Sequence, residues 1–294
     1  MKIFLIGGSG FLGTQLLKEL TQDSRVETII CLCHSTPISV VSDKIVQIYG
    51  DVRNVNELML DVPIDVCVVV SGITNGLKYT PEIVKTVNAT GTDNAILFCR
   101  RNNIKRIVLT SSVNVCLKTK GAYAKSKKHA ETAVRYSGLD YLIFRPALIF
   151  GHNIKNGLGV IEAYGRKHGI VPVFGNGKKL EQPIFVDECA KFMVWYIVNE
   201  ITGRIIGLYG PNPIEYNELC KTIGSLRGLR FKLLHLPVFP FWLCTKIIES
   251  LNIPFPINSE QIIHVDSDLT GDMTAIQKET GIEQENFEVN FLKD

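Results

Sequence analysis

Blocks of like charge and long uninterrupted apolar runs are both missing from this sequence of 294 residues. Its 32 Lys and Arg residues and 29 Asp and Glu residues are spread along the chain and leave a net charge of +3. A chain of this kind has no strong field of one sign, so we expect neither nucleic acid nor an anionic membrane as its partner. With 46% hydrophobic residues, the chain still has enough apolar side chains to bury a large core.

The most apolar late stretch, residues 231–248, is interrupted by lysines, a histidine and prolines. These interruptions exclude a membrane-spanning helix, which needs about 20 apolar residues. We expect instead a buried or partner-facing helix after Pro240. An export signal is not expected either, because the apolar run at the N-terminus stops at Gly7.

Cysteine pairs with the spacing of zinc or redox sites are also missing, although the chain has eight cysteines. The nearest approach to a ligand cluster is Cys31, Cys33 and His34. On a strand, the two cysteines would share one face and His34 would point to the other, so we predict packing and no metal site. Reduced, buried thiols indicate a cytoplasmic protein.

Short β-rich apolar runs alternate with helical patterns through the first two thirds of the chain. The expected strands are residues 3–6, 28–32, 45–48, 66–70, 106–109 and 141–144, and the expected helices are residues 11–20, 81–101 and 123–136. This alternation predicts an α/β fold, a Rossmann doubly wound parallel sheet with helices on both faces. Residues 184–187 and 204–209 are expected to return to the sheet.

Beyond Pro146 the sequence pattern changes. Glycines recur in a segment that we expect to form loops, and prolines then interrupt the expected helices. We therefore predict two units that are interleaved along the chain. The first is an NAD(P)-binding Rossmann domain of residues 1–150 plus about 181–210. The second is a small, discontinuous C-terminal substrate lobe of about 151–180 plus 211–294.

The run Gly7-Gly8-Ser9-Gly10-Phe11-Leu12-Gly13 follows the first expected strand and opens the first helix. Residues without Cβ allow a tight turn, and the pyrophosphate of a dinucleotide can then approach the N–H groups at a helix N-terminus. We expect cofactor contacts from the residues of this turn: Gly7, Gly10, Phe11, Leu12 and Gly13.

The second expected strand ends in Cys31-Leu32-Cys33-His34-Ser35, where NAD-specific sites place an acid that holds the ribose hydroxyls. Cys33 takes that position, and His34 and Ser35 can accept a 2′-phosphate. NADP is therefore preferred over NAD, and both cofactors stay open. Asp51, with Val52, is expected at the adenine, and a turn or helix cap is the alternative.

Tyr123 and Lys127 lie four residues apart, hence one helical turn apart on the same face. A tyrosine transfers protons poorly at neutral pH unless a neighbouring cation stabilises its phenolate, and Lys127 can supply that charge. Ser112, after an expected strand, can hydrogen-bond a substrate oxygen. Asn88 can order a water relay behind the lysine.

In this order, these features resemble the short-chain dehydrogenase/reductase superfamily, and in particular its extended sugar-nucleotide epimerase/dehydratase branch. The resemblance covers about residues 1–225. The matching elements are Gly7, Gly10 and Gly13; Gly50-Asp51; Val87-Asn88 through Gly91-Thr92; Ser111-Ser112; Tyr123 with Lys127; Phe144-Arg145-Pro146 through Gly151; and Val186-Asp187-Glu188.

The resemblance implies that Tyr123 exchanges a proton with a sugar hydroxyl while hydride passes to or from nicotinamide. It implies that Ser112 orients the oxygen and that Lys127 lowers the pKa of Tyr123 and holds the nicotinamide ribose. Asn88 would support the site. Further cofactor contacts are implied for Ser71, Gly72, Arg145 and Pro146.

Two departures from the family pattern concern the substrate side. Glu181 stands where many members have an arginine that holds the substrate diphosphate, and Lys178 or Lys179 is expected to compensate. Cys116 replaces the tyrosine that usually follows the serine motif.

The sequence therefore predicts an NAD(P)-dependent 4-epimerase or 4-keto reductase of a sugar nucleotide. The alternative is a non-catalytic NAD(P)-binding sensor or scaffold, which would not need Tyr123, Lys127 and Ser112. A homodimer that pairs through the helices at residues 81–101 and 123–136 is also expected from the resemblance.

Overall fold

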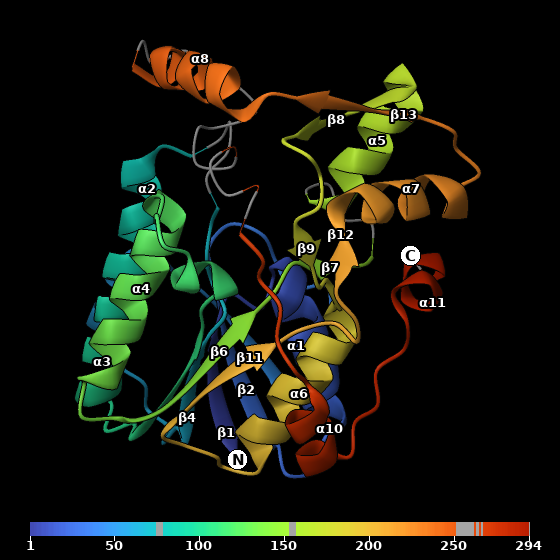
Figure 1. The fold of residues 1–294 in the computed structure, drawn as a ribbon. Coiled ribbons are helices and arrows are strands. Elements are labelled where there is room, and N and C mark those ends of the chain that lie inside the picture. Colours follow the sequence, from blue (N-terminus) through green and yellow to red (C-terminus); the bar gives the residue numbers. More distant parts are fainter. Residues whose placement is uncertain (75–78, 153–156, 251–261, 263–264, 266, 294) are drawn as a thin grey trace.

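Seven parallel strands form the central sheet of the protein in a computed structural model that describes residues 1–74, 79–152, 157–250, 262, 265 and 267–293. Their order across the sheet is β11-β6-β5-β4-β1-β2-β3 (Figure 1). The bounds are β1 Lys2–Ile6, β2 Thr28–Cys33, β3 Ile45–Tyr49, β4 Val66–Val69, β5 Arg106–Thr110, β6 Asp140–Pro146 and β11 Arg204–Leu208. The predicted α/β Rossmann fold is confirmed.

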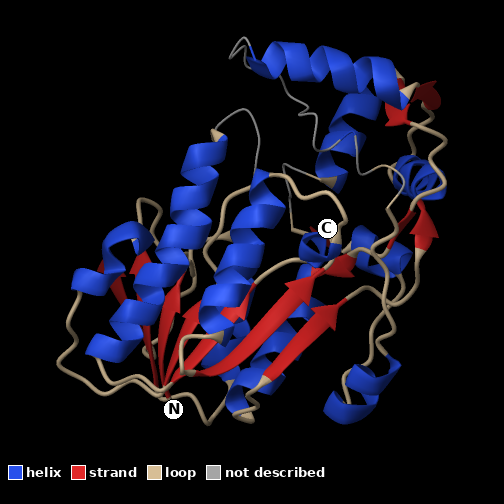
Figure 2. Ribbon diagram, turned by 60° about the vertical axis from the view of Figure 1, so that its left-hand side comes forward, coloured by secondary structure: helices blue, strands red, loops and turns tan. Residues whose placement is uncertain are grey.

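The strand order reverses between β1 and β4, which are neighbours in the sheet although two strands separate them in the chain. Helices cover both faces of the sheet (Figure 2). In open sheets of this kind, ligands bind at the carboxyl ends of the strands where the order reverses. The loops that follow β1 and β4 therefore border the expected ligand crevice.

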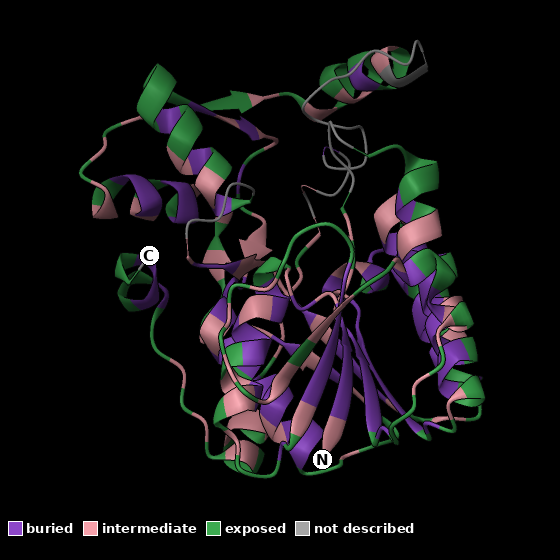
Figure 3. Cartoon of the chain, turned by 180° about the vertical axis from the view of Figure 1, so that it is seen from behind, coloured by how far each residue is buried: buried purple, intermediate pink, exposed green. Residues whose placement is uncertain are grey.

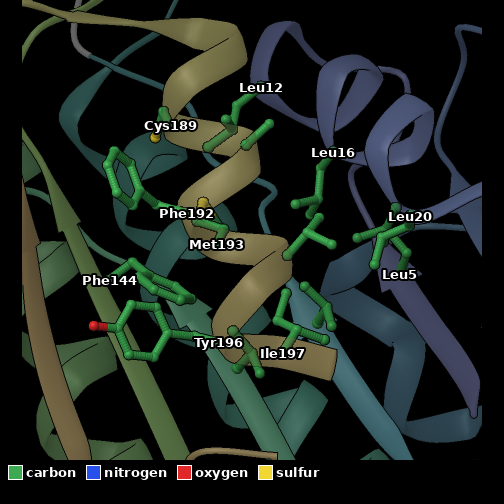
Figure 4. Packing of buried hydrophobic residues seen from close by; sticks show 14 of the residues in the cluster. Leu5, Leu12, Leu16, Leu20, Phe144, Cys189, Phe192, Met193, Tyr196 and Ile197 are labelled. Carbon is green, nitrogen blue, oxygen red and sulfur yellow. The ribbon is translucent and has the colours of Figure 1, made fainter. Parts of the chain in front are cut away.

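One face of the sheet is covered by α1 (Phe11–Gln22) and α6 (Val186–Val198). Leu12 and Leu16 of α1 face Cys189 and Met193 of α6 across a buried cluster (Figure 4). The apolar residues of α1 recur every three or four positions, which places them on the side that meets the sheet. This packing fixes the direction in which α1 leaves the glycine turn.

The other face is covered by α2 (Pro81–Lys85), α3 (Gly91–Arg101) and α4 (Ala122–Arg135). The single helix expected over residues 81–101 is wrong in one respect, because the π-helical turn η2 (Thr86–Thr90) separates α2 from α3. A Cβ on Gly91 would lie 2.9 Å from Val52, so the chain approaches its neighbour closely where the turn ends. The π turn contains Asn88, a predicted site residue.

The return to the sheet expected at residues 184–187 is also wrong. Strand β10 (Ile184–Phe185) pairs instead with β7 (Ile149–Phe150) in a separate two-stranded sheet, and Val186 begins α6. A short apolar run does not by itself distinguish a strand from the start of a buried helix. The return expected at residues 204–209 is confirmed as β11.

The remaining elements above the sheet are α5 (Leu158–His168), β8 (Ile170–Phe174), β9 (Leu180–Glu181), β12 (Ile214–Glu215), α7 (Tyr216–Leu226), β13 (Lys232–Leu236), α8 (Val238–Ser250) and α11 (Phe287–Leu292). A further apolar cluster, centred on Phe150, Phe185 and Leu219, packs between α5, β8, α7 and α11. Most of the elements above the sheet belong to the predicted substrate lobe. Residues 251–261 of that lobe lie outside the described part of the chain.

Helix α10 (Thr274–Thr280) belongs to the predicted lobe by sequence but packs beside the sheet. Met273 joins the cluster that contains α1 and α6, and Glu279 accepts hydrogen bonds from Arg204 of β11 and Tyr196 of α6, both at 2.6 Å. The division of the chain into two domains therefore stays a prediction.

The helix expected after Pro240 is present as α8, which begins two residues earlier. Within the described residues, no helix has the length and apolar character needed to cross a membrane. Figure 3 shows exposed positions along α8, whereas the strands of the central sheet are buried. Phe239, for example, is 68% exposed. The sequence left two expectations for this helix, a buried position or a surface that faces a partner, and the exposed side chains exclude the buried position.

Candidate functional site

The glycine turn connects β1 to α1 and brings three backbone segments into contact. Gly7 has a φ of 99°, which favours glycine, and its carbonyl accepts a hydrogen bond from Gly10 N at 3.1 Å. A Cβ on Gly13 would lie 2.1 Å from that carbonyl oxygen, and a Cβ on Gly7 would lie 2.6 Å from Ser71 N. The turn therefore lies directly against the end of β4.

Gly10 is the N-cap of α1, and no side chain caps the helix there. The first N–H groups of α1 are thus available to an anion, and the helix dipole favours negative charge at this end. Leu12 is buried under the helix, whereas Phe11 is 36% exposed. The turn has the shape that a dinucleotide pyrophosphate requires, so the residues present fit this cofactor.

The predicted packing role of Cys31 and Cys33 agrees with their surroundings. Both thiols are buried, with their sulfur atoms 3.8 Å apart, and burial raises the pKa of Cys31 to about 12. A Cβ on Gly8 would lie 2.3 Å from Cys31 Sγ, so this thiol fills the space under the glycine turn. In the part of the chain that the structure describes, no group of three or more His, Cys, Asp or Glu residues has a metal-binding arrangement.

His34 and Ser35 are both exposed just after β2, as a contact to the cofactor would require. His34 Nε2 lies 3.3 Å from Asp51 Oδ2. Asp51 in turn caps the 3₁₀ helix η1 (Val52–Glu57) and accepts a hydrogen bond from Arg53 Nε at 2.9 Å. Hydrogen bonds from Arg53 hold the pKa of Asp51 below its ordinary value.

Arg53 was not among the predicted site residues, although it supplies the fixed positive charge that the end of β2 lacks. The sequence offers one indication of this contact, because Arg53 follows Asp51 by two residues, the spacing at which an aspartate that caps a helix accepts a hydrogen bond from the later residue. Val52, predicted beside Asp51, is buried against Gly91 and is not open to solvent.

Lys127 of α4 is buried between the carboxyl ends of two strands. Its Nζ donates to the carbonyl oxygens of Thr110 at 3.0 Å and Ser71 at 3.4 Å. A Cβ on Gly72 would lie 2.7 Å from this Nζ, so the ammonium group of Lys127 packs directly against the backbone of this glycine. Burial lowers the pKa of Lys127 to about 8, and the ammonium form therefore still predominates at neutral pH.

Asn88 stands between the loop after β4 and helix α4. Its amide group exchanges two hydrogen bonds of 2.9 Å with the backbone of Ile73 and donates to Ser126 Oγ at 3.1 Å. Ser126 donates to the carbonyl oxygen of Tyr123 at 2.7 Å. Ser126 is a supporting residue that the sequence reasoning missed, because a serine inside a helix carries no distinctive spacing.

Tyr123 lies in the first turn of α4, and Ser112 is the N-cap of the 3₁₀ helix η3 (Val113–Cys116). Burial raises the pKa of Tyr123, and its hydrogen bond with Ser112 acts in the lowering direction. The predicted lowering by Lys127 is not among the influences on this phenol, and that role of the lysine stays a prediction. The structure does bring Tyr123 and Ser112 together.

One hydroxyl group beside these residues, Thr110 Oγ1, has no hydrogen-bond partner among the described atoms, and Thr110 is 8% exposed. The neighbouring Ser111 hydroxyl interacts with the Glu131 carboxyl group and contributes to lowering its pKa. Buried hydroxyls are normally paired. The position of Thr110 at the end of β5 agrees with a site that a ligand or water completes.

Arg145, a predicted cofactor contact on β6, has its guanidinium paired with the buried Glu131 of α4. Its Nε and Nη2 donate to the two Glu131 carboxylate oxygens at 2.8 and 2.7 Å. Arg145 Nη1 also donates to Cys116 Sγ at 3.7 Å. Pro146 is the last residue of β6. The pair holds β6 and α4 together, and the contact of Arg145 with the cofactor stays a prediction.

The substrate side departs from the family pattern in a way that charge pairing explains. Lys179 Nζ lies 2.7 Å from Glu181 Oε1, so the acid in the usual arginine position is neutralised by a lysine two residues away. Lys178 is exposed. Close by in the sequence, Asp187 of α6 pairs with His152 at 2.8 Å, a contact that the sequence reasoning did not anticipate.

A pair of glycine variants separates the folding role of the turn from its binding role. Gly13→Ala places a methyl group against the Gly7 carbonyl and is expected to reduce the free energy of unfolding by about 3 kcal/mol. Gly10→Ala, whose Cβ would lie 3.3 Å from the same oxygen, is expected to change it by less than about 1 kcal/mol. Gly10→Ala should instead weaken dinucleotide binding about tenfold or more. Urea unfolding and calorimetric titration measure the two effects, and unchanged affinity in Gly10→Ala would contradict the role of the turn.

The buried Glu131–Arg145 pair gives a pH-dependent prediction. Burial raises the pKa of Glu131, but the hydrogen bonds from Arg145 and Ser111, together with the positive charges of Arg145 and Lys128, outweigh it and the net pKa is lowered. The pair therefore stabilises the fold at neutral pH, and this contribution is lost as the pH falls through the folded-state pKa. Glu131→Gln should cost about 2 kcal/mol at neutral pH and progressively less in acid. Urea unfolding across pH, with the exposed Glu57→Gln as control, tests this; a pH-independent difference would refute it.

Comparison with known proteins agrees with this geometry. The NAD(P)H-binding family matches residues 7–169, which is more than half of the chain. An undecaprenol-linked N-acetylglucosamine 4-epimerase of Escherichia coli, N-acetyl-alpha-D-glucosaminyl-diphospho-ditrans,octacis-undecaprenol 4-epimerase, is 26% identical over 80% of this chain and 75% of its own length. Human short-chain dehydrogenase/reductase family 42E member 1 is 25% identical over 63% of this chain, which spans about half (55%) of that protein.

Solved structures show the same fold over the whole chain. A dTDP-glucose 4,6-dehydratase of Streptomyces venezuelae superposes with a TM-score of 0.78 at 16% identity, over 100% of this chain and 95% of that one. A UDP-glucuronic acid 4-epimerase of Bacillus cereus gives 0.75 at 14% identity, over 100% and 97%. Both were solved with NAD. The chain therefore belongs to the NAD(P)H-binding family and has the fold of these NAD-bound dehydratase and epimerase structures.

Proposed function

We propose that the protein is an NAD(P)-dependent enzyme that reduces a 4-keto sugar nucleotide or epimerises the sugar at that carbon. The observation that carries the proposal is the hydrogen bond between Tyr123 and Ser112, with the buried Lys127 one helical turn after Tyr123 and hydrogen-bonded to Ser71, which lies against the glycine turn. Tyr123, Ser112 and Lys127 all lie at the carboxyl edge of the sheet, where β4 and β5 end. A sensor or scaffold would not need this combination.

Tyr123 is the proton donor in the proposed reaction. The phenol carries its proton at pH 7 and can protonate a substrate carbonyl oxygen, although burial raises its pKa and makes the help of a neighbouring cation necessary. Ser112, hydrogen-bonded to the phenol, orients the same oxygen. A bound nicotinamide would supply or accept the hydride.

Lys127 and Asn88 support the proton donor. The ammonium group of Lys127 is fixed by two carbonyl groups one helical turn after Tyr123, where its charge favours the phenolate that remains after proton transfer. Asn88 holds the loop after β4 and, through Ser126, the first turn of α4. These contacts keep the phenol and the ammonium in one geometry.

For the cofactor, we propose a preference for NADP. Arg53, His34 and Ser35 are exposed together near the end of β2, and Arg53 neutralises the Asp51 carboxylate that would otherwise repel a 2′-phosphate. NAD remains the alternative, because Asp51 can also accept a hydrogen bond from a ribose hydroxyl.

For the substrate, we propose a nucleotide sugar whose diphosphate lies near Lys178. The sugar would lie between Tyr123 and the elements that follow Pro146, with Cys116 and Tyr209 beside it.

A homodimer is proposed through α2, α3 and α4, where Ile83 and Leu97 are 39% and 43% exposed.

Replacing Tyr123 tests the proposed reaction. Tyr123→Phe should retain NADPH affinity and lower turnover about 100-fold or more, because only the proton donor is removed. NADPH consumption with UDP- and dTDP-linked 4-keto sugars is the measurement. Tyr136→Phe, a matched change at the exposed end of the same helix, should leave turnover unchanged. Normal turnover in Tyr123→Phe would remove this residue from the mechanism, and NADPH binding without any turnover of the wild-type protein would favour the sensor.

The cofactor released when the purified protein is denatured tests the reaction type. Stoichiometric NAD would favour an epimerase with a resident cofactor and contradict the NADP preference. Released NADP, or an empty site that binds NADPH over NADH, would support an exchanging reductase.

Removing the guanidinium of Arg53 tests the NADP preference directly. Arg53→Ala should weaken NADPH binding about tenfold, the size of one charge-assisted contact, with little change for NADH. Arg135→Ala, which removes an exposed arginine elsewhere, serves as the control. Equal losses for the two cofactors would show that Arg53 does not read the 2′-phosphate.

A further inference from the structure

Helix α8 presents large apolar side chains to solvent. Phe239 and Leu243 are 68% and 44% exposed, and because they lie four residues apart they share one stripe along the helix. Thr245 is buried on another side of the helix, and the Phe241 ring packs edge-on against Phe174 of β8 at 5.7 Å. The stripe therefore points away from the contact that anchors α8.

The apolar surface continues from α8 onto the β8–β13 ribbon. Leu234 of β13 is 50% exposed, and Ile170 of β8 is 41% exposed. Lys232 and Leu234 lie on the same face of the ribbon, because alternate residues of a strand share a face. Figure 1 shows α8, β13 and the end of α5 along the upper rim of the molecule. We call this surface the rim.

Positive charge gathers around the rim. Residues 157–174 and 227–250 contain six Lys and Arg residues and two acids, a formal charge of +4, whereas the whole chain has +3. The rest of the chain is therefore slightly negative. Lys167, at the end of α5, and Arg230 and Lys232, before and in β13, are exposed. Folding thus concentrates charge that is evenly spread along the sequence.

We propose that the rim docks on an anionic lipid surface, with α8 lying in the plane of the interface. Its 13 residues span roughly 20 Å, too short to cross a bilayer and suited to lie along one. Phe239, Leu243 and Trp242 are side chain types that insert at the headgroup boundary, and the surrounding cations attract anionic headgroups.

The rim lies on the same side of the molecule as the carboxyl ends of the strands and the start of α4 (Figure 1). Docking would therefore hold the candidate site close to the lipid surface. Lipid is favoured over a protein partner because the apolar stripe is continuous with a surface that carries a net positive charge, which matches an anionic headgroup layer. This proposal does not depend on the reaction proposed above.

Trp242 provides a direct reporter of docking, because the chain has only one other tryptophan, Trp195. In a Trp195→Phe protein of full length, vesicles of phosphatidylglycerol and phosphatidylcholine should shift Trp242 emission to shorter wavelength and sediment the protein. Pure phosphatidylcholine should bind it about tenfold more weakly. An absence of both the shift and the sedimentation would overturn the proposal.

Two rim variants separate the apolar and the electrostatic contributions. Phe239→Ser with Leu243→Ser should abolish sedimentation, and Lys167→Glu with Lys232→Glu should weaken it about tenfold or more and remove its salt dependence. Both should retain NADPH affinity and the urea midpoint, which shows that they are folded. Val41→Ser, at a 98% exposed position, is the matched control. A vesicle-independent dimer that the serine variant dissociates would assign the rim to a second copy of the chain and overturn docking on lipid.

Discussion

The buried ammonium group of Lys127 is the constraint on which the arrangement of the site depends. Burial lowers the pKa of this lysine to about 8, which corresponds to a cost of about 3 kcal/mol at neutral pH. Two backbone carbonyl groups, from the ends of β4 and β5, accept its hydrogen bonds. Both strand ends and the start of α4 must therefore hold their relative positions, and Tyr123 is placed one turn before the lysine. Such a costly group is typical of a functional site.

The glycine turn imposes a second constraint at the same edge of the sheet. Gly13 passes the carbonyl group of Gly7 so closely that no side chain fits, and Gly7 lies against Ser71 beyond β4. The loop after β4 thus contacts the turn through Ser71 and the lysine through Gly72. Cofactor binding and proton transfer, as we propose them, share this loop, and Asn88 fixes it through Ile73.

Ion pairs stabilise the protein at positions where the chain departs from the family pattern or lacks a charge that the pattern has there. Lys179 neutralises Glu181, Glu131 holds the guanidinium of Arg145, and Arg53 neutralises Asp51. Each pair changes which charges are available to a ligand. Arg53 removes the negative charge of Asp51 near the proposed ribose position, while the guanidinium of Arg145 is held by Glu131 of α4. The charges that face a substrate therefore depend on pairing in the folded chain as much as on residue type.

The sequence alone determined the Rossmann fold and predicted most residues of the candidate site, because strand and helix periodicities and the glycine, Tyr–Lys and serine patterns act over short distances. It also indicated a helix after Pro240. Only the tertiary structure decided the π turn around Asn88, the entry of Val186 into a helix instead of the sheet, and the return of α10 to the sheet side. It likewise decided that Arg145 pairs with Glu131 and that cations of α5 and β13 share the rim with the apolar side chains of α8. These features depend on contacts between residues far apart in the chain, for which local patterns carry no signal.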